Sequence, residues 1–126
     1  MQGALRAFVA LFGAACVAIA LTHIFVGPSS IPGSIPVNPT MDSEDRFYAT
    51  LFLGFGAVHL WCARDLAART GPLVAMQAVF FLGGVARLIS WAQVGPPIPM
   101  FIWLGAIELL LPLLLWLALR RANSGT

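Results

Sequence analysis

Glu108 lies inside a long apolar stretch, residues 101–119. A carboxylate within a lipid bilayer is costly, and it is usually paired with an opposite charge or kept for a function. Arg87 lies about 10 Å along the preceding helix from its end at Val94, at 1.5 Å per residue. Glu108 lies about 12 Å from the start of its own helix at Met100. We therefore expect an Arg87–Glu108 ion pair between neighbouring helices.

The surroundings of this pair allow two interpretations. Pro112 has no N–H to donate to the Glu108 carbonyl, so we expect a free acceptor and a bend there. Glycines precede both residues by about one turn, at Gly83, Gly84 and Gly105, which in membrane helices more often indicates close packing than a pocket. The pair is either a salt bridge that fixes helix register or a ligand or proton site. A structural arginine could also orient a functional glutamate.

Other polar residues are expected at the same end of the helices. Ser90 lies one turn from Arg87, His23 lies near the end of the first apolar segment, and Asp45 and Arg46 lie just before the second. We therefore predict one outward-facing polar pocket. Its expected ligand-binding residues are Arg87, Glu108, Arg46, Ser90, His23 and Asp45.

The remaining reactive side chains carry weaker signals. His59 and Cys62 share a helix face, but no third ligand stands near them, so we expect an interior histidine and no metal site. The chain has no C-x-x-C pair, phosphate-binding loop or nucleophile elbow. The cofactor therefore stays unknown, and no catalytic residue is assigned, although Glu108 would be the acid or base of an enzyme.

Composition places the chain in a membrane. Of 126 residues, 60% are hydrophobic and only 10% are charged, against about a quarter charged in soluble domains. The net charge of +2, spread along the chain, excludes nucleic acid as an expected partner. The lipid bilayer is the expected partner, and association with further copies of the chain stays open.

Four apolar segments approach the roughly 20 residues that cross a bilayer as a helix. We expect the first, which contains signal-peptide-like features at Cys16 and Ala18, to be retained as a helix. The predicted fold is a single all-α domain, 1–126, an integral membrane four-helix bundle. Its helices are expected at about 5–26, 43–64, 72–94 and 99–121.

Arginine placement predicts the orientation. Basic residues lie at the N-terminus, in the second loop and at the C-terminus, whereas the opposite loops carry acids or no charge. By the positive-inside rule, both termini are expected in the cytoplasm.

The outer loop, 27–42, is rich in proline and is expected to be extended and stiff. Asp42 or Ser43 is the expected N-cap of the next helix. Asp42 and Arg46 stand four residues apart and should pair on its surface. The loop could also act as a lid over the outer mouth of the bundle.

Several motifs carry a family resemblance. They are Asn38-Pro39-Thr40-Met41-Asp42, Asp45-Arg46-Phe47-Tyr48, Gly83-Gly84-Val85-Ala86-Arg87-Leu88-Ile89-Ser90, Gly95-Pro96-Pro97 and Glu108-Leu109-Leu110-Leu111-Pro112. Together they resemble the small four-helix bacterial membrane proteins of domain-of-unknown-function family 4345. The resemblance implies a fold and a location in a bacterial inner membrane, but no activity. A looser resemblance, at the level of fold, is to four-helix scaffold proteins that organise sterol-modifying enzymes.

Three functions remain open. The first is binding of a lipid-like or quinone-like molecule, or service as an accessory subunit of a membrane complex. The second is a membrane enzyme acting on an isoprenoid or lipid, which would need Glu108 in a protonation state that Arg87 disfavours. The third is a proton-coupled exporter protomer, ranked last because the first helix carries no acid.

Overall fold

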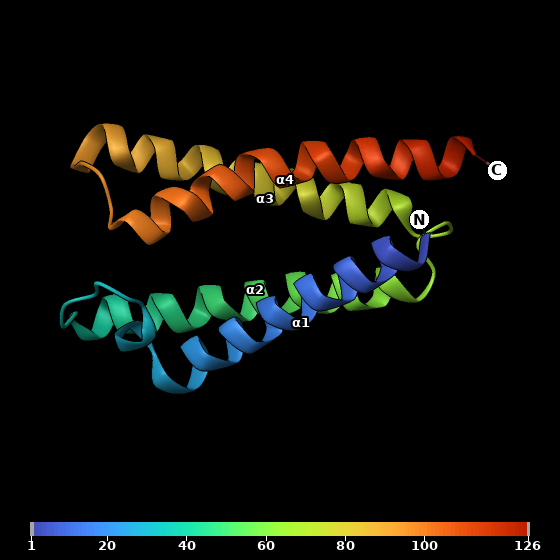
Figure 1. The fold of residues 1–126 in the computed structure, drawn as a ribbon. Coiled ribbons are helices and arrows are strands. Elements are labelled where there is room, and N and C mark those ends of the chain that lie inside the picture. Colours follow the sequence, from blue (N-terminus) through green and yellow to red (C-terminus); the bar gives the residue numbers. More distant parts are fainter. Residues whose placement is uncertain (1, 126) are drawn as a thin grey trace. The chain divides into compact units, whose positions relative to one another are not determined.

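The computed structural model describes residues 2–125, and these are almost entirely helical. Among them the predicted all-α fold is confirmed, with no strand. Figure 1 shows four long helices and a short 3-10 helix, with these bounds: α1 Gln2–Val26, η1 Pro28–Ser30, α2 Pro39–Arg64, α3 Thr70–Val94 and α4 Pro99–Ser124. The helices begin or end a few residues beyond the predicted bounds.

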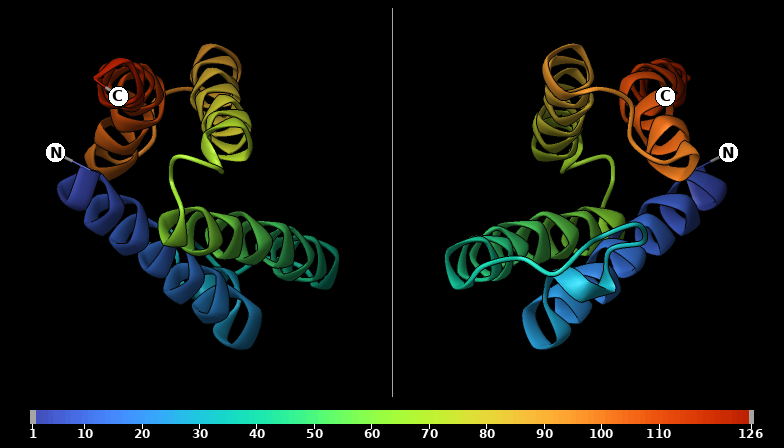
Figure 2. Two further views of the ribbon diagram at one scale, coloured as in Figure 1. Left: turned by 90° about the vertical axis from the view of Figure 1, so that its right-hand side faces the viewer. Right: turned by 90° about the vertical axis from the view of Figure 1, so that its left-hand side faces the viewer.

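The four long helices form two compact units. α1 and α2 make one hairpin, α3 and α4 make the other, and the boundary lies between Leu66 and Ala67. Within each hairpin the two helices run antiparallel, as Figures 1 and 2 show. The third and fourth helices are therefore neighbours, as the expected ion pair requires.

The helices have the length and surface of membrane spans. α1, α3 and α4 are each long and apolar enough to cross a bilayer, and they expose large apolar side chains such as Leu11, Leu82 and Leu114. The protein is therefore a membrane protein. α2, expected as a fourth span, falls short of the same measure, because Arg46 and Arg64 bound its uncharged stretch and His59 interrupts it.

Two glycines set the packing of α1 on α2. A side-chain carbon at Gly13 would lie 2.9 Å from the backbone oxygen of Gly56, and one at Gly56 would lie 2.9 Å from that of Gly13. Only glycine at both positions lets the backbones approach this closely, as in other tightly packed membrane helices. Cys16 and Cys62 are both buried in the same hairpin.

The N-terminus of α2 corrects one prediction. The N-cap is Asn38, whose side-chain oxygen accepts a hydrogen bond of 2.9 Å from the Met41 N–H, and Pro39 opens the helix. Asn at the cap followed by Pro at the first helical position is a favoured pairing. The expectation of Asp42 or Ser43 as the cap was therefore wrong, and both lie within the helix.

The predicted stiff loop between α1 and α2 also begins with local structure. Gly27 has a positive φ of 87°, which suits glycine, and it ends α1 by donating its N–H to the His23 carbonyl. η1 follows directly, so the loop starts with a helical turn rather than with an extended, proline-rich segment.

Candidate functional site

Arg87 on α3 and Glu108 on α4 form the predicted ion pair. The Nε–H of Arg87 donates to both carboxylate oxygens of Glu108, with Oε2 at 3.0 Å. Glu108 is only 7% exposed, whereas the Arg87 side chain is 43% exposed. The acid is therefore buried between the helices, and the arginine reaches it from the surface of the hairpin.

The surrounding residues fix the orientation of Arg87. Its guanidinium lies 5.5 Å from the centre of the Phe101 ring, within the range of a cation–π contact. Its aliphatic stem passes Gly105, where a side-chain carbon would lie 3.5 Å from Cδ. Within residues 2–125, Nη1 and Nη2 make no hydrogen bond, so the terminal donors of Arg87 remain available. Ser90 is exposed one turn further along α3.

Pro112 lies inside α4, which continues through it as a helix. The missing proline N–H leaves the Glu108 carbonyl without its usual helical donor. This acceptor and the carboxylate belong to the same residue, so α4 concentrates hydrogen-bond acceptors at Glu108.

Arg46 has a structural role in the α1–α2 hairpin. Its Nε donates to Asp42 Oδ1 at 2.8 Å, which confirms the predicted pair, and its Nη1 donates to the Ile24 carbonyl at 2.8 Å. Its Nη2 reaches the Val26 carbonyl at 3.4 Å. The hydrogen bond to Asp42 raises the pKa of Arg46 above its usual value, so the guanidinium stays charged. Arg46 thus satisfies carbonyls that the end of α1 would leave unpaired.

His23 and Asp45 form a second link between α1 and α2. The Nδ1 atom of His23 lies 3.1 Å from Asp45 Oδ2 and 3.2 Å from Oδ1. Both side chains are partly exposed. This contact lies beside those of Arg46. His23 on α1 and Asp45 and Arg46 on α2 therefore hold the end of α1 to the start of α2.

The six predicted site residues therefore fall into two groups. His23, Asp45 and Arg46 come together in the α1–α2 hairpin, while Arg87 and Glu108 pair in the α3–α4 hairpin with Ser90 nearby. A single pocket shared by all six stays a prediction.

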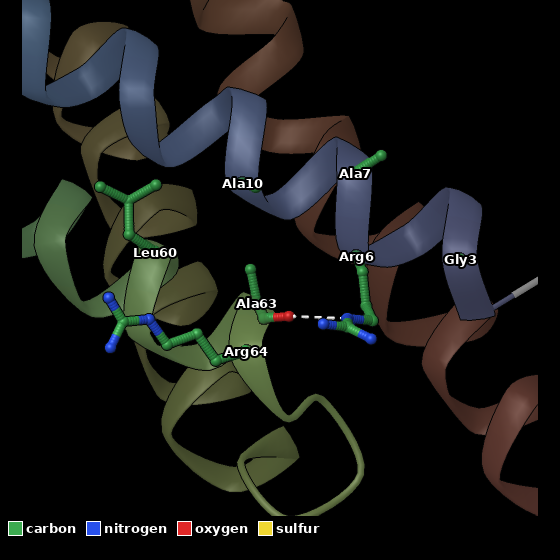
Figure 3. A pocket seen from close by; sticks show the side chains of 7 residues that line it. All are labelled: Gly3, Arg6, Ala7, Ala10, Leu60, Ala63 and Arg64. Atoms are coloured by element: carbon green, nitrogen blue, oxygen red, sulfur yellow. Dashed lines mark hydrogen bonds between the residues drawn. The ribbon is translucent and has the colours of Figure 1, made fainter.

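The contact between Arg6 and α2 was not predicted from the sequence. Arg6, near the start of α1, donates from Nε to the carbonyl of Ala63 in the last turn of α2, at 3.0 Å (Figure 3). Arg6 thus binds a carbonyl at the end of α2, as Arg46 binds carbonyls at the end of α1. Each helix of this hairpin thus has its C-terminal carbonyls bound by an arginine of the other, a role that only the tertiary structure reveals.

The histidine expected in the interior is buried. His59 is fully buried, its Nδ1 lies 2.8 Å from the Phe55 carbonyl, and its ring packs against Phe12 and Phe55. An Nδ1–H donated to the carbonyl one turn earlier satisfies this polar group inside an apolar core.

Each hairpin also has a cavity that is open to its surface. The one in α3–α4 has a volume of about 370 Å³ and is lined mainly by apolar side chains, including Phe81, Leu82, Pro112 and Trp116. The one in α1–α2 has a volume of about 430 Å³ and includes Arg6. None of the six predicted site residues is among those that line either cavity.

Comparisons with known proteins agree with the resemblance carried by the motifs. Neither a curated protein nor a solved structure shows significant similarity to the chain. A family model, by contrast, covers nearly all of it, including both hairpins. The chain belongs to the family described as Domain of unknown function (DUF4345), whose model matches residues 4–119.

Proposed function

We propose that this protein binds a small hydrophobic molecule with a neutral, quinone-like or lipid-like head group at Arg87, in the inner membrane of a bacterium. The observation that supports this most is that Arg87 uses only one of its N–H groups to bind Glu108. Its Nε–H is used by Glu108, while its Nη donors are unused within residues 2–125, and the Arg87 side chain is partly exposed.

The charge of the pair selects the head group. Glu108 neutralises Arg87, so the site carries no net charge but keeps directional N–H donors. A neutral acceptor such as a quinone carbonyl fits these donors, whereas an anion would meet the buried carboxylate close by. The pair also pre-orients the donors, which lowers the entropic cost of binding.

The cavity in the same hairpin suits the apolar part of such a molecule. Pro112, Leu115 and Leu119 line it, and they follow Glu108 on one face of α4 at helical spacing. Its volume of about 370 Å³ is within the usual range for small-molecule sites, roughly 300–1,000 Å³. A polar head group would then bind at Arg87, and an apolar tail would pack along this face of α4. An accessory subunit of a membrane complex could present its ligand in the same way.

An enzyme acting through Glu108 is the second candidate. It is disfavoured because both oxygens of Glu108 already accept from Arg87 and would have to leave this partner to reach a substrate.

Binding of a decyl-substituted benzoquinone to the purified protein in detergent, followed by quenching of tryptophan fluorescence, tests the proposal. Trp91 and Trp103 lie within about one or two turns of the pair and would report occupancy. We expect Arg87→Gln to abolish saturable quenching and Arg121→Gln, the same change of charge in the last turn of α4, to leave it intact. Equal quenching in the wild type and Arg87→Gln would refute the proposal, and mass spectrometry of solvent extracts would identify a molecule that copurifies.

A further inference from the structure

The cavity of the α1–α2 hairpin differs in charge from the Arg87 site. Two arginines, Arg6 and Arg64, line it, and the other lining residues carry no charge: Gly3, Ala7, Ala10, Leu60 and Ala63. Asp65 follows in the chain but does not line the cavity. The cavity therefore offers two positive charges without a carboxylate to neutralise them.

The donors of these arginines are only partly used. Arg6 donates from Nε to the Ala63 carbonyl, which fixes its side chain across the end of α2. Within residues 2–125, the Nη groups of Arg6 and the guanidinium of Arg64 make no hydrogen bond or ion pair. Figure 3 shows the two side chains leaving on either side of Ala63, so they flank the cavity rather than meet in it.

The remaining lining is apolar and small. Ala7 and Ala10 on α1 and Leu60 on α2 form a surface of hydrocarbon beside the two cations. Acyl chains and glycerol carbons match such a surface, and guanidinium groups bind phosphate oxygens well. Basic pockets between membrane helices on the cytoplasmic side bind anionic head groups, and the arginine distribution predicts this end of the hairpin to be cytoplasmic.

We infer that the Arg6–Arg64 cavity binds the phosphate head group of an anionic phospholipid such as phosphatidylglycerol. This site is independent of the proposed function, because it lies in the other hairpin and is cationic rather than neutral.

Native mass spectrometry of the full chain in detergent, titrated with phosphatidylglycerol or phosphatidylcholine, tests the inference. We expect preferential binding of phosphatidylglycerol. Each basic residue removed should weaken that binding about fivefold, and both together about 25-fold. Arg64→Gln is the cleaner variant, because Arg6→Gln also removes the hydrogen bond to Ala63. Arg121→Gln, with the same change of charge in the other hairpin, is the matched control and should bind as the wild type does.

Three outcomes would overturn the inference. They are equal binding of the two lipids, an equal loss in Arg121→Gln and Arg64→Gln, or displacement of the lipid by millimolar inorganic phosphate. The last would assign the cavity to free phosphate instead of a lipid. Quinone quenching measured on Arg64→Gln should be unchanged, which separates a failure here from a failure at Arg87.

Discussion

Glu108 lies directly against Gly84: a side-chain carbon at Gly84 would be 3.2 Å from the Cβ atom of Glu108. The same carbon would be 2.9 Å from two side-chain atoms of Leu109, so either Leu109 or α4 would have to move. Gly84 therefore sets the distance between α3 and α4 at the level of the ion pair.

Gly84→Ala should destabilise the protein. The overpacking costs about 1–3 kcal/mol, and over most of that range the cost is larger than the gain of about 1 kcal/mol from replacing glycine by alanine within a helix. Gly83→Ala is the matched control, because its new carbon would make only an ordinary contact of 3.7 Å with Glu108 Oε2. Thermal unfolding in detergent, followed by circular dichroism, should give a lower midpoint for Gly84→Ala alone. Equal midpoints would contradict the close packing.

Gly56→Ala should be more damaging than Gly84→Ala. Its new carbon would meet the backbone oxygen of Gly13 at 2.9 Å, and a backbone cannot yield as a leucine side chain can. Gly54→Ala, on the same helix, would meet nothing within 4 Å and serves as the control. We expect the midpoint of unfolding to fall for Gly56→Ala and to stay level or rise for Gly54→Ala. A reversed order would rule out the observed crossing of α1 and α2.

Arg46→Gln should loosen the junction between α1 and α2. The carbonyls of Ile24 and Val26 would lose their donors, and Asp42 would lose its partner. Hydrogen–deuterium exchange should then speed up at the end of α1 and the start of α2, with little change in α3. Arg64→Gln provides the control, and equal acceleration in both variants would argue against the capping role.

The junction should also be insensitive to moderately alkaline pH. Because the pKa of Arg46 is raised, its contribution to stability is present below the usual arginine pKa and is lost only at a still higher pH. In the wild type, the protection factors of the amides at this junction should therefore stay level between pH 7 and 9.

The sequence carried enough information for the helices and for the central ion pair. Long apolar segments admit few other structures in a membrane, and two charges at equal depth on neighbouring helices have little choice of partner. The N-cap at Asn38 could also be predicted, because Pro39 directly after it is a strong helix-start signal. The acidic residues Asp42 and Glu44 instead favour a helix start further along the chain, which explains the wrong prediction.

The remaining features depend on tertiary structure. Nothing in the spacing of Gly13, Gly54 and Gly56 tells which glycines meet, since the crossing point depends on all the contacts between two helices. Arg46 and Arg6 likewise bind backbone carbonyls of the opposite helix, and carbonyls are present at every residue. Their structural roles could not be distinguished from ligand binding by residue type alone.

The central claim is that the Arg87–Glu108 pair orients a binding group and is more than a link between α3 and α4. The most direct test is benzoquinone quenching in the double variant Arg87→Leu with Glu108→Leu, which removes both charges together and leaves neither buried alone. We predict that this variant unfolds at about the wild-type temperature but shows no saturable quenching. A double variant that folds and still binds the quinone as the wild type does would contradict the claim.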